Sequence, residues 1–291
     1  MLQRSLTTAI VLLGLTASAA NAVPAWKSGS NGYRASSFAS WRGSPLGVAV
    51  GYAPTDTWAH MLAYASADNP KKLRSMSPNV SIAFGLFPKS GGNLIDCAAG
   101  KYATNHRSIG QRLAANGVGD AEIRLGWEAT NTSFVWTAVA RPAELWKACF
   151  TSAAKALKAG SPAIRISWHM AKKGKMNALT IWPADAPITN IGISHYDDAE
   201  ARYGMELTKE GSPWGLRAWL AFARSKGKGL ELSEWGVGRV GDNPGYIQKM
   251  HDFFIEAGPT LAHEGYLNSA GHELYNPTKW PKASAMYRKL F

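Results

Sequence analysis

The chain has 291 residues, of which 46% are hydrophobic and 18% are charged, and its formal net charge is +12. This composition excludes a disordered or fibrous protein, and the length is sufficient for a sizeable core. The basic residues are spread along the sequence, with only short groups such as 71–72 and 226–228. Scattered charge is typical of a solvated surface. A basic exported protein would also suit an acidic polysaccharide or an anionic cell surface, and we expect no nucleic-acid binding.

The N-terminal segment 1–22 has the features of a secretory signal peptide. Arg4 precedes the apolar run 9–15, and Ala20-Asn21-Ala22 offers the small residues of a cleavage site. The apolar run is short for a bilayer span, so a retained membrane anchor is the weaker alternative. We therefore expect residues 23–291 to form one mature domain that is secreted or periplasmic, with no membrane span.

The only two cysteines are Cys97 and Cys149. An oxidising compartment allows a disulfide between them. A free, buried Cys149 on a helix is an equal alternative. Neither cysteine has neighbours at metal-ligand spacing, and we expect no metal ion.

Strand-like and helix-like segments alternate through the rest of the chain. Segment 27–44, rich in Ser and Gly, is expected to be irregular. The expected strands are 46–52, 79–87, 123–128, 163–168, 191–196, 230–236 and 261–267. The expected helices cover 56–65, 103–115, 213–225 and 244–256, and another opens at 141–144. We place an eighth strand between 60 and 77, near 72–76. This alternation predicts an α/β fold, a single (β/α)8 TIM barrel.

Two glutamates, Glu128 and Glu234, lie at the ends of two of these expected strands. The carboxyl ends of barrel strands meet at one face, so distant carboxylates can converge there. Cleavage of a sugar–sugar bond needs two carboxyl groups, one able to donate a proton and one ionised. Either residue alone could be an ordinary acid in a surface loop, but together they favour a glycoside hydrolase.

Alternation along the strand places Arg124, Gly126 and Glu128 on the same side. An inward Arg124 would lie beneath the active site and keep a partner carboxylate ionised. The alternative is that Arg124 forms a purely structural ion pair.

These residues carry a resemblance. Segment 124–128 with Trp136 downstream, and segment 232–236, resemble the strand-four and strand-seven motifs of clan A glycoside hydrolases, most closely family 26. That family contains β-mannanases and relatives built on (β/α)8 barrels that retain anomeric configuration. The resemblance implies that Glu128 is the general acid/base and Glu234 the nucleophile, and that Tyr196 donates a hydrogen bond to Glu234.

The chain departs from the family 26 pattern next to the acid/base. Mannanases of that family usually have His immediately before this Glu, where the present chain has Trp127. They often have Asn-Gly soon after it, where the present chain has 129–131 as Ala-Thr-Asn. Because these positions surround the subsite of the scissile sugar, mannan is doubtful as the substrate.

Aromatic residues are abundant, with 12 Trp and 10 Tyr. Tryptophan and tyrosine rings stack on the apolar faces of sugars. Two histidines, His169 and His195, follow strand ends and are candidates for substrate contact, with capping or packing as equal alternatives. The aromatic candidates expected at the active face are Trp127, Trp136, Trp168, Tyr196 and Trp235.

The sequence as a whole predicts a monomeric, endo-acting, retaining hydrolase of a β-linked polysaccharide. An acidic exopolysaccharide or matrix polymer is the candidate substrate. No cofactor is expected. The two carboxyl groups are expected about 5 to 5.5 Å apart. The alternative from another class is a non-catalytic carbohydrate-binding barrel that has kept the cleft.

Overall fold

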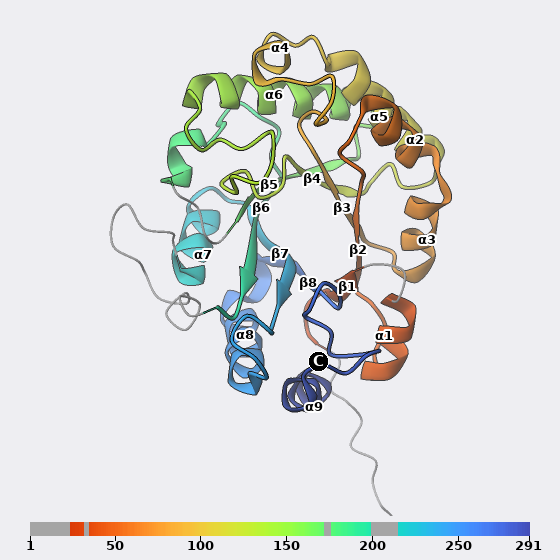
Figure 1. The fold of residues 1–291 in the computed structure, drawn as a ribbon, viewed down its shortest axis with the longest axis vertical. Coiled ribbons are helices and arrows are strands. Elements are labelled where there is room, and N and C mark those ends of the chain that lie inside the picture. Colours follow the sequence, from red (N-terminus) through yellow and green to blue (C-terminus); the bar gives the residue numbers. More distant parts are fainter. Residues whose placement is uncertain (1–23, 32–34, 172–175, 199–214) are drawn as a thin grey trace, which may run out of the picture.

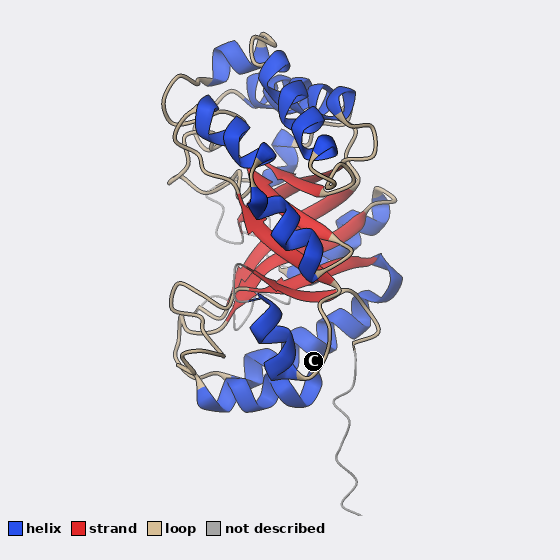
Figure 2. Cartoon of the chain, turned by 90° about the vertical axis from the view of Figure 1, so that its right-hand side faces the viewer, coloured by secondary structure: helices blue, strands red, loops and turns tan. Residues whose placement is uncertain are grey.

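Eight parallel strands close into a barrel in the computed structural model, which describes residues 24–31, 35–171, 176–198 and 215–291. The strands follow one another around the barrel in sequence order, and helices surround them (Figure 1). Figure 2 shows the strands from the side, with the helices outside them. The predicted (β/α)8 barrel is therefore confirmed. The expected signal peptide lies outside the described residues.

The strands are β1 (Ser28–Asn31), β2 (Val48–Tyr52), β3 (Val80–Phe84), β4 (Glu122–Leu125), β5 (Arg165–Ala171), β6 (Asn190–Tyr196), β7 (Gly229–Gly236) and β8 (Leu261–Tyr266). The helices are α1 (Ala35–Arg42), α2 (Trp58–Ser66), α3 (Asp68–Met76), α4 (Leu94–Ala98), α5 (Ala103–Ala115), α6 (Ala143–Gly160), α7 (Leu216–Ser225), α8 (Pro244–Ala257) and α9 (Pro281–Leu290). Short 3₁₀ turns are η1 (Ala178–Ile181) and η3 (Gly258–Thr260).

The placement of the eighth strand was wrong. Residues 72–76 belong to α3, and the missing strand is β1, inside the segment expected to be irregular. Pro70 stands in the first turn of α3, where proline is tolerated, and Leu73 anchors this helix in the core. The β1 sequence Ser-Gly-Ser-Asn has no apolar residue and therefore gives no strand signal. Its small side chains fit the barrel: a Cβ on Gly29 would meet the Val48 carbonyl oxygen at 1.9 Å.

Strand β7 is irregular on both sides. Its pairing with β6 shifts register between Gly192 and His195, and its pairing with β8 shifts between Leu232 and Trp235. Such irregularities re-aim side chains and are frequent beside active sites. Glu234 lies on this distorted part of the strand.

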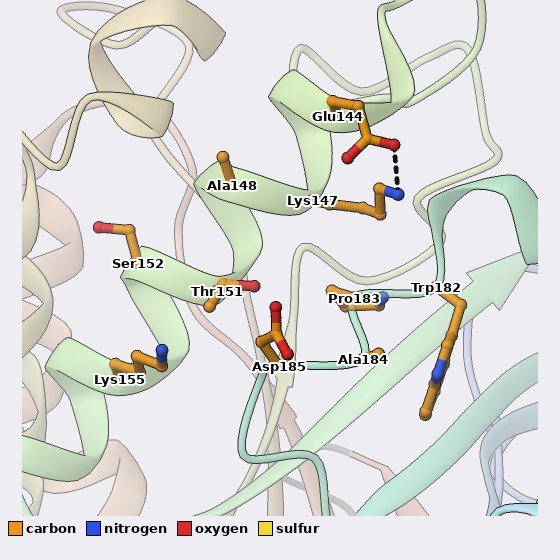
Figure 3. A pocket seen from close by; sticks show the side chains of 10 residues that line it. All are labelled: Glu144, Lys147, Ala148, Thr151, Ser152, Lys155, Trp182, Pro183, Ala184 and Asp185. Atoms are coloured by element: carbon orange, nitrogen blue, oxygen red, sulfur yellow. Dashed lines mark ion pairs between the residues drawn. The ribbon is translucent and has the colours of Figure 1, made fainter.

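The connection between β5 and β6 has only the turn η1 in its described part, whereas most other strands are followed by an α-helix. A hollow of about 500 Å³ lies on the outer wall here, against α6 (Figure 3). Its rim includes an ion pair between Lys147 and Glu144. The lining residues are Glu144, Lys147, Ala148, Thr151, Ser152, Lys155 and Trp182–Asp185. None of the predicted site residues is among them.

Cys97 on α4 and Cys149 on α6 form a disulfide, so the first of the two alternatives for these cysteines is correct. The bond joins residues 52 positions apart and ties the short α4 to the longest helix. Both cysteines are buried.

Replacing both cysteines with alanine should lower the free energy of unfolding by about 4 kcal/mol, the value expected for a closed loop of this length. The effect comes chiefly from the greater freedom of the unfolded chain. Chemical denaturation of the purified double variant against the parent protein measures it. Equal stabilities would contradict a structural role for the disulfide.

Candidate active site

Glu234 is held by three groups from three other strands. The Tyr52 hydroxyl at the end of β2 donates to Oε2 at 2.9 Å, and the Tyr196 hydroxyl at the end of β6 donates to Oε1. Arg124 Nη1 lies 3.6 Å from Oε2. Both carboxylate oxygens therefore have partners, and the side chain has a fixed orientation. The contact from Tyr196 is the one that the family resemblance implies.

Arg124 lies inside the barrel and is completely buried. Its Nη2 donates to the carbonyl oxygen of Gly51 at 3.0 Å, and its guanidinium lies over the Tyr52 ring, 4.7 Å from the centroid. The positive charge stabilises a negative charge on Glu234. Burial, followed by the charge of Glu234, raises the pKa of Tyr52 and of Tyr196 well above the usual value. Both phenols therefore remain hydrogen-bond donors at neutral pH.

Glu128 occupies a turn beyond β4, and not the end of the strand as predicted. The strand stops at Leu125, and Gly126 and Glu128 have φ values of +56° and +52°. The expected alternation from Arg124 to Glu128 is therefore broken by two left-handed residues. A non-glycine residue in this region is strained, and such strain concentrates at functional sites.

Two side chains position Glu128. Its backbone N–H donates to His169 Nδ1 at 3.2 Å, and Asn131 Nδ2 donates to Oε2 at 2.6 Å. The backbone N–H of Ala129 also donates to the His169 carbonyl oxygen. Burial lowers the pKa of His169 to about 4, so its ring is neutral and Nδ1 can accept the hydrogen bond.

The proton affinity of Glu128 differs from that of an ordinary glutamate. Burial, and next the negative charge of Glu234, raise its pKa to about 7. A carboxyl group with this pKa is still partly protonated at neutral pH and can donate its proton. The site thus combines a carboxyl group that can act as a proton donor with a second carboxylate held beside a buried arginine.

Both glutamates line one cavity of about 460 Å³ at the carboxyl ends of the strands. Glu128 comes from the turn after β4 and Glu234 from β7, two strands that are not neighbours in the barrel. The other lining residues are Asn131, Ala171, Ser194, Tyr196, Asp198 and Arg239.

Three predicted stacking residues do not reach this cavity. Trp136, Trp168 and Trp235 are completely buried and have no face free for a sugar ring. Trp235 follows Glu234 on β7, so it points outward from the barrel, and its Nε1 donates to Glu264 Oε2 at 2.6 Å. The Trp168 ring lies against Trp182 and other aromatic residues outside the barrel. These tryptophans stabilise the scaffold of the site.

Trp127 and the two predicted histidines also lie behind the cavity and do not line it. Trp127 is only 7% exposed and contacts the Tyr52 ring edge-on, with centroids 6.4 Å apart. His169 is buried beneath the Glu128 turn. His195 is buried as well, and its Nδ1 lies 2.7 Å from the Tyr246 hydroxyl. The expected substrate contacts are therefore corrected: His169 positions Glu128, and His195 packs against Tyr246 in the interior.

Tyr52, Asn131 and Arg239 are among the residues at the site that were not predicted. Tyr52 is the last residue of β2, and this position was a signal, because polar side chains at strand ends face the site. Asn131 and Arg239 lie in irregular connections, where no periodicity indicates the direction of a side chain.

Below the site, the barrel interior contains a second ionisable cluster. Ser167 and Ser233 donate to Glu231 at 2.7 and 2.6 Å, and Asn190 donates to Glu122. His263 Nε2 lies 3.3 Å from Glu122 Oε1. Ligand atoms of Glu122, Glu231 and His263 lie within 4.8 Å of one another, close enough to share a cation. Existing hydrogen bonds already use most of these atoms.

The two carboxyl groups of this cluster differ in charge. Burial, and next the charge of Glu231, raise the pKa of Glu122 to about 8. Burial alone would also raise the pKa of Glu231, but the neighbouring His169, His263 and Arg124 outweigh it and lower this pKa to about 2. Glu122 is therefore protonated and Glu231 ionised at neutral pH.

The raised pKa of Glu122 predicts a loss of stability with rising pH. The stabilising contribution of its proton is complete below the unfolded value of about 4.5 and disappears as pH rises to about 8. Glu122→Gln mimics the protonated form, so its stability relative to the parent should increase by at least about 1 kcal/mol between pH 5 and pH 8. Urea unfolding at both values measures the change. Glu144→Gln, at an exposed position, is the control, and equal pH dependence of all three proteins would contradict the assignment.

Solved structures share the fold of the chain. A GH26 β-mannanase from Bacteroides ovatus superimposes with a TM-score of 0.60 at 15% identity, covering 86% of this chain and 80% of that one. GH26C from Muricauda sp. gives 0.64 at 12% identity, covering 93% and 85%. A fungal β-1,4-galactanase gives 0.60 at 15% identity, covering 86% and 89%. These likenesses establish the fold and agree with the family resemblance in the motifs.

No protein-family model matches the sequence, and no curated protein matches it. Among the described residues, no helix combines the length and apolar character needed to cross a membrane.

Proposed function

We propose that this protein is a retaining, endo-acting glycoside hydrolase of a β-linked polysaccharide. The observation that carries the proposal is the pair of carboxyl groups in one cavity: Glu128, whose raised pKa suits a proton donor, and Glu234, whose two oxygens are held by Arg124, Tyr52 and Tyr196. Such a pair supplies the acid and the nucleophile that hydrolysis with retention requires. The shared fold with glycoside hydrolases supports the same proposal.

The reaction takes place in two displacements. Glu234 attacks the anomeric carbon and forms a glycosyl ester, while Glu128 gives its proton to the departing glycosidic oxygen. Glu128 is then a carboxylate and removes a proton from water. This water attacks the anomeric carbon, breaks the ester and restores both carboxyl groups to their starting states. The expected separation of about 5 to 5.5 Å between the two groups suits this route.

The supporting residues have distinct parts in these steps. Tyr52 and Tyr196 orient the attacking carboxylate, and Arg124 compensates its charge before the ester forms. When Glu234 becomes an ester, its negative charge no longer opposes ionisation of Glu128, which helps Glu128 act as a base.

The remaining features belong to the same proposal. Segment 1–22 directs export, residues 23–291 form the mature, monomeric enzyme, and the disulfide between Cys97 and Cys149 suits an oxidising compartment. The chemistry uses no organic cofactor.

Reducing-end release by the mature protein tests the proposal, with mannan, mixed-linkage glucan, xylan and acidic bacterial exopolysaccharides as substrates. Hydrolysis of at least one polymer, lost in both Glu128→Ala and Glu234→Ala, is the expected result. Tight binding of a polymer without hydrolysis, unchanged in both variants, would favour a non-catalytic carbohydrate-binding barrel instead.

A further inference from the structure

The proposed mechanism assigns no role to Arg239, the basic residue among those that line the cavity. Arg239 follows β7 and lines the same cavity as Glu128 and Glu234. Its exposed side chain lies over the Tyr196 ring, with Cζ 5.1 Å from the centroid. Within the part of the chain that the structure describes, no side chain or carbonyl group accepts a hydrogen bond from this guanidinium.

The backbone beneath this arginine is fixed in place. The Arg239 N–H donates to Oδ1 of the buried Asp197 at 2.8 Å. Gly238 has φ +112°, and a Cβ there would approach the Gly271 carbonyl oxygen to 2.7 Å and Trp280 Nε1 to 2.9 Å. The turn is therefore packed against a neighbouring loop. A side chain that starts from a fixed backbone and stacks on a ring loses little freedom when it binds a ligand.

The position of Arg239 limits which part of a substrate it can reach. Tyr196 connects the two groups, because its ring lies under Arg239 and its hydroxyl donates to Glu234. Because only the Tyr196 side chain separates the Arg239 guanidinium from Glu234, this guanidinium can reach substituents on a sugar that is bound at Glu234. Arg124, the other arginine at the site, is buried and already engaged with Glu234.

We propose that Arg239 binds the carboxylate of a uronic acid seated beside Glu234, so that the substrate is a β-linked acidic polysaccharide. This inference rests on the proposed function. A guanidinium pairs with a carboxylate through two parallel, charge-assisted hydrogen bonds, and the hydroxyl groups of neutral sugars carry no negative charge to strengthen such a pair. The net charge of +12 attracts a polyanion to the surface. Asp198 and Glu234 are the other acidic residues of the lining besides the proton donor Glu128, so Arg239 is the lining residue that favours a substrate carboxylate.

Binding to matched oligosaccharides tests this inference. The protein used is the full mature chain carrying Glu128→Gln, which blocks turnover. Isothermal titration calorimetry compares two pairs of ligands of equal length. The first pair is β-1,4-linked oligomannuronate and oligomannose, and the second is oligoglucuronate and cello-oligosaccharide. Each pair differs only in a carboxylate or a hydroxymethyl group at C6. In at least one pair the uronate should bind about tenfold more tightly or better, and Arg239→Gln should abolish this preference. Arg239→Lys should restore part of it.

Arg288→Gln is the matched control, because Arg288 is also exposed and stacks on an aromatic ring, Trp41, but lies on α9. It removes the same charge and should leave the preference intact. Equal or tighter binding of the neutral member in both pairs, no binding of either uronate, or an unchanged preference in Arg239→Gln would each overturn the inference.

Hydrolysis by the otherwise unchanged protein separates this inference from the proposed function. Cleavage of a neutral polymer without any preference for uronates would support the proposed hydrolase and contradict the proposed role of Arg239. Uronate binding that depends on Arg239, without cleavage of any polymer, would support the proposed uronate site and contradict the proposed hydrolase activity.

Discussion

Replacing Glu234 with alanine should lower kcat by about 10⁴-fold or more, because no other group can form the glycosyl ester. The fold should survive, since the side chain is partly exposed at the cavity and its removal leaves Tyr52 and Tyr196 open to water. Reducing-end release on the polymer that the unaltered protein cleaves measures the loss, and thermal unfolding checks the fold.

Added azide gives a second readout for Glu234→Ala. A small anion can enter the space left by the carboxylate and attack the anomeric carbon from the same face. With an activated aryl β-glycoside, the expected product is the α-glycosyl azide. Glu256→Ala, at an exposed ion pair with Arg217, is the control and should retain full activity. A Glu234→Ala protein with more than a tenth of the original activity would contradict its role as the nucleophile.

Glu128→Ala should lower kcat by about 10² to 10⁴-fold on the natural polymer, the range expected for loss of a general acid and base. The loss should be much smaller on an aryl glycoside whose leaving group needs no protonation. Azide should then yield the β-glycosyl azide, because it attacks an ester formed on Glu234. The opposite azide products of the two variants distinguish the two roles.

The pH dependence follows from the raised pKa of Glu128. The first step needs this carboxyl group protonated, so kcat/KM should fall as pH rises through about 7. The Glu128→Ala protein should lack this alkaline limb. Initial rates across the neutral range measure both profiles, and an unchanged alkaline limb in the variant would assign the ionisation to another group.

Most of the fold could be predicted because its strands are apolar and its helices are periodic. Helix α5 has the bounds that the sequence suggested, and β6 and β8 differ from theirs by one residue. Strand β1 could not be found, since its four small residues are buried through closure of the barrel and not through hydrophobicity. Residues 72–76 suggested a strand only because the barrel needed one more.

At the site, the sequence indicated which residues are involved better than it indicated where their side chains point. Glu128, Glu234, Arg124 and Tyr196 converge, because strand ends meet at one face of a barrel. Of the aromatic predictions, Tyr196 lies at the cavity, but Trp136, Trp168 and Trp235 do not. For Trp235 the reason is physical: a tryptophan next to an inward residue on a strand points outward, and it packs among helices.

The anomeric configuration of the first product tests the central claim most directly. Proton NMR during the first minutes of hydrolysis, on the polymer identified by reducing-end release, resolves the α and β anomers before they interconvert. Two displacements by Glu234 and Glu128 predict that the β anomer appears first. Initial appearance of the α anomer would show inversion, and would contradict a glycosyl ester on Glu234.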